Sequence, residues 1–243
     1  AIAATLLTSG SSLTNDTTDT SASITPTANA LVLAFNLHVA TAAAGLEHGS
    51  TLVGNSMEWV PVAGSLVDAG NTPNELAALT VWAAQDSAPT AGTLVWSFVS
   101  TQANGSWAVV QVTGHDTTTP LYMLPGLAAI RRAAIRGYPD GSTVAGTSVE
   151  LGMGSFRSAS NGIIVAAAHL VNEGTAPGAG LTELADVTTT EGTALEISWA
   201  AAPVYRPSAS WVTSTANRAL IAIELAVPSN TSFVADPVAD LYT

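Results

Sequence analysis

The sequence contains no cysteine and no lysine, and these two absences exclude several kinds of protein. Without cysteine the chain forms neither a disulfide nor a thiolate metal site. Its six basic residues are all arginine, against 18 acidic residues, and the formal net charge is −12. Such a charge repels the phosphate backbone of nucleic acids and disfavours anionic membranes. We therefore expect neither nucleic acid nor a membrane as a partner.

Charged residues and long apolar runs are also scarce. Charged residues make up 10% of the 243 residues, whereas soluble domains usually have roughly 25%. Two explanations fit this scarcity of charge. One is a coding bias towards Ala, Thr and Gly over a well-packed fold, and the other is a surface covered by identical copies or by a larger assembly. The longest apolar runs, residues 30–35 and 162–168, are too short for a membrane helix. The N-terminal AIAATLLTSG lacks the positive charge of a secretory signal, so we expect a soluble chain or part of a soluble assembly.

The clearest strand lies in residues 105–116, GSWAVVQVTGHD. Between residues 106 and 113 polar and apolar residues alternate loosely, as in a strand with at least one buried face. We predict that this strand lies near the centre of a sheet. The two expected faces are Trp107, Val109 and Gln111 on one side and Ala108, Val110 and Val112 on the other.

Other stretches of the chain also have the length and composition of strands. Residues 76–84 (LAALTVWAA) fit either a helix or a strand, and we favour a strand because Pro89 and Gly92 follow. Residues 127–136 (LAAIRRAAIR) have a helical spacing of apolar residues, which predicts a short helix or a loop turn. About a dozen strands at spacings of 8–12 residues indicate an all-β fold.

Two stretches of the chain are alike. SITPTANALVLAFNLHV, residues 23–39, and SFRSASNGIIVAAAHLV, residues 155–171, share an Asn, an apolar run and a histidine near its end. The repetition indicates either an ancient duplication or two sheets built alike, and it lacks the regularity of a solenoid. No linker separates the halves, so we predict one sandwich across both.

We predict an antiparallel β-sandwich, jelly-roll-like, with extended arms at both ends. Residues 24–227 form the sandwich, with similar halves at about 24–114 and 155–227. Residues 1–23 form an N-terminal arm, which either frays or pairs with a neighbouring subunit, and residues 228–243 form a C-terminal extension.

No motif for catalysis, metal binding or cofactor binding stands out. The four histidines, His38, His48, His115 and His169, lack the spacing of metal ligands. Loop oxygens that could hold Ca²⁺ have no EF-hand spacing; they belong to Asp16, Asp19, Asp236 and Asp240. No GxSxG sequence occurs. We expect no cofactor and no enzymatic activity.

An acidic cluster in the second half is the nearest approach to a glycosidase site; it comprises Glu183, Asp186, Glu191 and Glu196. Retaining glucanases with a jelly roll carry alternating carboxylates on one strand, similar to ExDxE. Glu183 and Asp186 are three residues apart, so we expect them on opposite sides of a strand.

The six tryptophans suggest either a core or a platform that stacks on sugars; they are Trp59, Trp82, Trp96, Trp107, Trp199 and Trp211. Most lie within apolar runs, which favours the core. Trp211, flanked by Ser210 and Thr213, is the best candidate for an exposed ring and a glycan contact.

Several segments, including ELAALTVWAAQDSAPTAGTL, GSWAVVQVTGHD and ASWVTSTANRALIAIELAV, together resemble a group of β-sandwich structural proteins of phage virions. The resemblance covers residues 24–227 and rests on strand and turn signatures. It implies a non-enzymatic capsid decoration or cement protein, homo-oligomeric, in contact with the major capsid protein or other virion proteins. A tail or fibre component and a carbohydrate-binding module that recognises surface glycans are the alternatives.

Overall fold

Antiparallel strands make up the regular secondary structure of the protein. The computed structural model describes residues 1–41, 50–67, 76–117, 130–137, 147–156, 158–212 and 217–228. These residues contain fifteen strands and no helix, and therefore no helix that could cross a membrane. The predicted all-β class is confirmed.

The first half of the chain forms a seven-stranded sheet. Its strands are β1 (Ala3–Ser12), β2 (Asp16–Thr20), β3 (Leu31–Ala40), β4 (Thr51–Gly54), β5 (Val60–Leu66), β6 (Leu76–Gln85) and β7 (Leu94–Thr113). The main path runs β1-β7-β3-β6-β5, while β2 and β4 flank the first part of the long β7.

The second half forms a five-stranded and a three-stranded sheet. The larger sheet contains β8 (Ile130–Gly137), β10 (Gly162–His169), β12 (Thr182–Thr188), β13 (Ala194–Ala200) and β15 (Arg218–Leu225), in the order β12-β13-β10-β15-β8. The smaller sheet contains β9 (Ser148–Glu150), β11 (Ala176–Pro177) and β14 (Ser208–Ser210), in the order β11-β14-β9.

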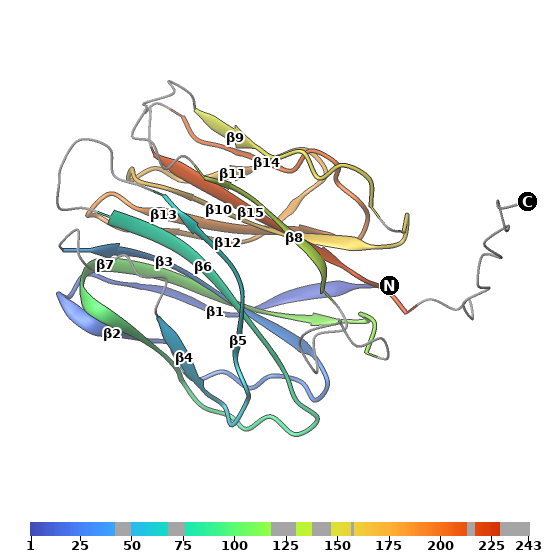
Figure 1. Ribbon diagram of the computed structural model, residues 1–243, viewed down its shortest axis with the longest axis horizontal. Coiled ribbons are helices and arrows are strands. Elements are labelled where there is room, and N and C mark those ends of the chain that lie inside the picture. Colours follow the sequence, from blue (N-terminus) through green and yellow to red (C-terminus); the bar gives the residue numbers. More distant parts are fainter. Residues whose placement is uncertain are drawn as a thin grey trace, which may run out of the picture.

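The sheets are stacked in layers with three apolar cores (Figure 1). The central core lies between the two large sheets and includes Leu33 and Phe35 of β3 and Ile164 of β10. A first outer core, with Trp96 and Trp107, lies where β2, β4 and the first part of β7 cover the seven-stranded sheet. The second outer core, with Val165 and Trp211, lies under the three-stranded sheet.

The strand predicted first, residues 105–116, corresponds to the second part of β7 and lies between β1 and β3. Ala108, Val110 and Val112 point into the central core, while Trp107 and Val109 point into the first outer core. The predicted faces are therefore confirmed. Residues 76–84, where helix and strand competed, lie in strand β6, as favoured.

Both halves follow the same path. In each large sheet, the chain first forms one edge strand, then the central strand and then the opposite edge strand. It then fills the two remaining places, first the one beside the second edge strand and last the one beside the first. These are β1, β3, β5, β6 and β7 in the first half and β8, β10, β12, β13 and β15 in the second. The outer strands repeat the same order, β2-β7-β4 and β9-β14-β11. Because β1 lies against β12 and β5 against β8, an approximate two-fold axis relates the halves.

Register shows which residues of the two halves are equivalent. His38 ends the outward face of β3 and lies opposite Gly105, while His169 ends the outward face of β10 and lies opposite Arg218. Each imidazole lies beside an aromatic ring of the outer layer, Phe98 at 4.8 Å for His38 and Trp211 at 4.5 Å for His169. The histidines, and not the asparagines of the repeated stretch, therefore mark equivalent positions.

The structure corrects two predictions. The N-terminal 23 residues are not an arm, because β1 and β2 pair with β7 of the same chain. Residues 130–137 form strand β8 and not a helix, since β15 supplies a partner along the whole strand and tertiary pairing overrides local helical propensity. Residues 127–129 and 229–243, including most of the predicted C-terminal extension, lie outside the described residues.

Candidate functional site

The two halves share an irregularity in the edge strand that follows the central strand. A β-bulge interrupts β5 between Pro61 and Ala63, and another interrupts β12 between Glu183 and Ala185. Bulges often occur beside functional sites because they redirect side chains. Both places are therefore candidate sites.

The equivalent residues at the two bulges differ in chemistry. The first bulge site comprises Pro61, Gly64, Thr80 and Trp82. The second bulge site comprises Glu183, Asp186, Glu196 and Ser198, which occupy the same register positions in the same order. Thr80 lies opposite Asn36 of β3, just as Glu196 lies opposite Ala167 of β10.

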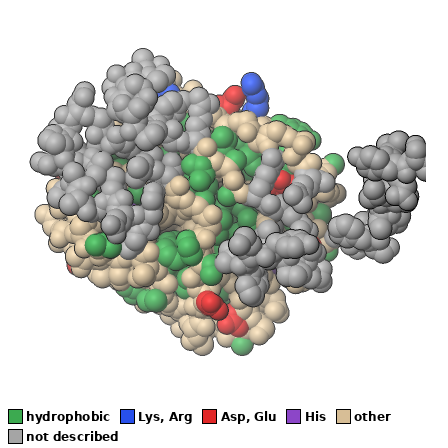
Figure 2. Space-filling model, in the orientation of Figure 1, with side chains coloured by type: hydrophobic (Ala, Val, Ile, Leu, Met, Phe, Trp, Pro, Cys, Tyr) green, Lys and Arg blue, Asp and Glu red, His purple; other side chains and the backbone are tan. Residues whose placement is uncertain are grey.

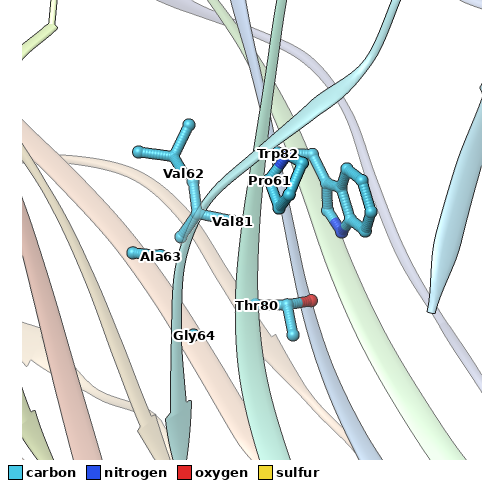
Figure 3. A pocket seen from close by; sticks show the side chains of 7 residues that line it. All are labelled: Pro61, Val62, Ala63, Gly64, Thr80, Val81 and Trp82. Atoms are coloured by element: carbon cyan, nitrogen blue, oxygen red, sulfur yellow. The ribbon is translucent and has the colours of Figure 1, made fainter. Parts of the chain in front are cut away.

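The first bulge site contains a pocket of about 270 Å³ (Figure 3). Its lining residues carry no charge; they are Pro61, Val62, Ala63, Gly64, Thr80, Val81 and Trp82. The Thr80 hydroxyl donates a hydrogen bond of 3.4 Å to the carbonyl of Asn36. The indole N–H of Trp82 is buried without a hydrogen-bond partner. This pocket offers apolar contact and one hydroxyl, and none of its side chains is suited to acid–base chemistry.

The second bulge site brings three carboxyl groups onto one face. The extra residue in the bulge of β12 places Glu183 opposite Ser198 and Asp186 opposite Glu196. Glu196 and Ser198 are two residues apart and therefore lie on the same side of β13. Their cross-strand partners, Asp186 and Glu183, consequently share a face. The prediction that Glu183 and Asp186 lie on opposite sides is wrong because simple alternation does not anticipate a bulge.

Glu196 is the most unusual residue of this group. Its side chain is 0% exposed, and neither carboxyl oxygen has a hydrogen-bond partner of good geometry. Burial raises the pKa of Glu196 to about 8; the nearby Ser198 hydroxyl lowers it in part, and the charges of Glu183 and Asp186 raise it further. Glu196 is therefore mostly protonated at pH 7.

A short segment, residues 173–177, covers this face and is called the strap below. The carboxylate of Asp186 accepts a hydrogen bond of 3.0 Å from the backbone N–H of Thr175. The Thr175 hydroxyl lies 2.8 Å from Nε2 of His169. Burial raises the pKa of Asp186, which the bond from Thr175 partly offsets. The strap is thus fastened by one side chain from β12 and one from β10.

Trp211 lies inside the second outer core. It is 4% exposed, its ring is stacked on His169 with an interplanar angle of 25°, and the guanidinium of Arg218 lies 5.7 Å from its centroid. Burial lowers the pKa of His169 to about 4, although Glu173 opposes the shift. The prediction of an exposed Trp211 is wrong, because the strand pairing of β14 turns this ring towards β10. A glycan has no access to it in this conformation.

The remaining tryptophans mostly fit the core interpretation. Trp59, Trp82, Trp96 and Trp107 are buried, and Trp199 is half-buried. Core packing of the tryptophans is therefore confirmed for five of the six, including Trp211.

The other predicted candidates are dispersed. His38, His115 and His169 are buried in separate places, and His48 lies outside the described residues. Asp19 is buried and accepts a hydrogen bond of 3.4 Å from Asn36, while Asp236 and Asp240 also lie outside the described residues. Within the described part of the chain, no three His, Asp or Glu side chains are grouped so that they could hold a metal ion.

The sequence identified the carboxylates of the second bulge site as an acidic cluster, but neither their common face nor the first bulge site could be found from it. The relevant signal is the register of β5 and β12, which depends on strands that are distant along the chain. The second bulge site has the carboxylates of a glycosidase but seals one of them away from solvent, whereas glycoside hydrolysis needs both carboxyl groups beside the sugar.

Comparison with known proteins adds no relative. No protein-family model matches the chain, and neither does any curated protein or solved structure.

Proposed function

We propose that the protein is a non-enzymatic structural component of a phage virion, a decoration or cement protein bound to the outer shell. The observation that carries this proposal is the scarcity of charge over a layered β-structure. Among the described residues, the face in Figure 2 carries few charged side chains, and apolar side chains gather near its middle. Surfaces buried between proteins are depleted of charge in the same way.

The free edges of the sheets support this proposal. At the ends of the two large sheets, the described strands β1, β5, β8 and β12 each pair on one side only. A strand with an unpaired side can add a strand from another protein. Four such edges give a small protein several ways to contact shell subunits or further copies of itself.

We also propose that each half is a jelly roll. Counting β7 as two strands, the inner layer of the first half has the order 1-8-3-6 and the outer layer 2-7-4, with the fifth strand paired to the sixth. The second half has the same order. Jelly rolls occur in viral capsid proteins and in lectins, so this topology supports both the leading proposal and the carbohydrate-binding alternative.

The carbohydrate-binding alternative has lost its best residue, because Trp211 is buried. Its remaining place is the uncharged pocket of the first bulge site, beside Pro61 and Trp82. A tail or fibre component stays the nearer alternative, since it needs the same charge-poor surface.

Quantitative mass spectrometry of purified virions tests the proposal by comparing the copy number of this chain with that of the major capsid protein. We expect hundreds of copies per particle. A handful of copies would move the protein to the tail or to a vertex. Its absence from the virion would overturn the proposal, and a glycan-binding assay would then test the carbohydrate-binding alternative.

A further inference from the structure

The strap of the second half covers a carboxylic acid that has no counterpart in the first half. The equivalent residue of Glu196 is Thr80, whose hydroxyl is hydrogen-bonded to a backbone carbonyl. Glu196 is fully buried, and both of its carboxyl oxygens lack a hydrogen-bond partner of good geometry. A buried group of this kind is stable only while it is neutral.

The groups around Glu196 offer an ionised carboxylate little compensation, because the Ser198 hydroxyl lowers its pKa only in part and the charges that act on it are negative. From β12, Asp186 lies directly opposite it, and Glu183 is near enough to act on it. From β10, His169 is neutral at ordinary pH because burial lowers its pKa to about 4. Glu173 of the strap is acidic. Arg218 of β15 lies over the Trp211 ring.

The strap depends on the same carboxyl groups. Asp186 holds the N–H of Thr175, and Asp186 is the cross-strand neighbour of Glu196. If Glu196 ionised in place, a fully buried carboxylate would lie directly opposite the exposed carboxylate of Asp186, and the two charges would repel each other. Solvent can reach Glu196 when the strap lifts, and lifting also separates Asp186 from its bond to Thr175.

We propose that Glu196 makes the strap a pH-sensitive cover, which stays closed while Glu196 holds its proton and opens as the proton is lost. In the first half, Thr80 stands in place of Glu196, so the segment that covers it, which includes β4, does not respond to pH. This inference rests on the second bulge site alone and does not depend on the virion proposal.

The useful pH range follows from the groups that titrate. Opening lets the Glu196 carboxyl ionise as in water, near its ordinary pKa of 4.5, whereas in the closed state its pKa is about 8. The open state therefore gains about tenfold per pH unit between these values. Opening also lets His169 take up a proton below about pH 6.5, which opposes the trend there. The range from pH 6.5 to 8 isolates the effect of Glu196.

Hydrogen exchange measured by mass spectrometry on the full chain tests the proposal. After correction for the intrinsic exchange rate, we expect the protection of peptides containing the strap and β14 to fall about tenfold per pH unit from pH 6.5 to 8. Peptides containing β4, in the cover of the first half, should keep constant protection. Equal pH dependence in the two covers would overturn the proposal.

Two variants sharpen the test. In Glu196→Gln, which keeps the shape of the side chain without the acid, protection of the strap should no longer change with pH. Glu191→Gln is the matched control, because Glu191 is exposed in the turn between β12 and β13, and it should behave as the parent protein does. A pH dependence that persists in Glu196→Gln would also overturn the proposal. If that variant does not fold, the comparison of the two covers in the parent protein decides.

Discussion

The two halves of the molecule share their irregular features as well as their regular ones, yet differ at the sites those features build. Both have a bulge at the same register position, and both place a histidine of the central strand beside an aromatic ring of the outer layer. Strand order alone could arise from two sheets built alike, but a shared bulge and a shared ring pair favour duplication. The first bulge site is an uncharged pocket, whereas the second holds three carboxyl groups. The same backbone therefore accommodates uncharged side chains in one half and acidic side chains in the other, so the side chains at these positions can change without a change of fold.

The largest expected effect concerns the centre of the sandwich, where the halves differ in side-chain size. Phe35 of β3 and Ala166 of β10 occupy equivalent positions in the central core, and both are fully buried. Phe35→Ala should lower the free energy of unfolding by about 3–5 kcal/mol, because it leaves a large cavity. Ala166→Gly is the comparison and should cost only about 1 kcal/mol. Urea unfolding measures both, and equal losses would show that the two positions are packed alike.

The second effect concerns Glu196, where the halves differ in charge. The folded-state pKa of about 8 lies above the ordinary value of 4.5, so the folded state binds more protons than the unfolded state between these pH values. Stability contributed by the proton is complete below about pH 4.5 and is lost as the pH rises to about 8. The parent protein should therefore lose up to about 1.4 kcal/mol of its free energy of unfolding per pH unit in this range, and Glu196→Gln should not show this loss. Urea unfolding at several pH values, for the variant and the parent, gives this difference; parallel profiles would contradict it.

A smaller effect of the same sign is expected at Asp19, a buried acid of strand β2 in the outer layer of the first half. Burial raises the pKa of Asp19 from 3.8 to about 6, although hydrogen bonds from Asn36 and Ser12 oppose the shift. The stability associated with its proton is lost as the pH rises from about 3.8 to about 6. Asp19→Asn should flatten the stability profile over that shorter range and leave the range above pH 6.5 parallel to that of the parent. Parallel profiles of variant and parent from pH 3.8 to 6 would contradict this, because they would mean that Asp19 is already ionised in the folded protein over that range.

The sequence predicts an element correctly where the pattern is local, and fails where a distant strand decides the conformation. Alternation in residues 105–116 was sufficient to assign both faces of β7 and its central place, because a strand buried on both sides must alternate between two cores. The stretch at residues 127–136 was misread because its partner, β15, lies about 90 residues further along the chain. The exposed ring expected at Trp211 is wrong for a similar reason, since its neighbour Ser210 is exposed while its own ring stacks on His169 of a distant strand.

The acidic residues of the second bulge site were evident in the sequence, but the arrangement of both candidate sites could not be predicted, because each depends on a single inserted residue. Without the bulge in β12, Glu183 and Asp186 would lie on opposite faces, and the second bulge site would not exist. A bulge has no fixed sequence signature in these strands, as Pro61 and Glu183 stand at equivalent positions. The repeated stretch was visible in the sequence, but only the register showed that its histidines, and not its asparagines, are equivalent.

The smallest expected effect concerns two exposed valines at equivalent positions of the outer layers. Val99 follows Phe98 in the first half and is 66% exposed, while Val212 follows Trp211 in the second half and is 82% exposed. Val99→Thr and Val212→Thr should each change the free energy of unfolding by less than about 0.5 kcal/mol, because surface substitutions away from packed groups have little effect. Urea unfolding at two protein concentrations measures this. A loss above about 1 kcal/mol at one valine only, growing with concentration, would contradict the expectation and show that copies of the chain cover that face; the two outer layers would then differ in their partners as the bulge sites differ in their chemistry.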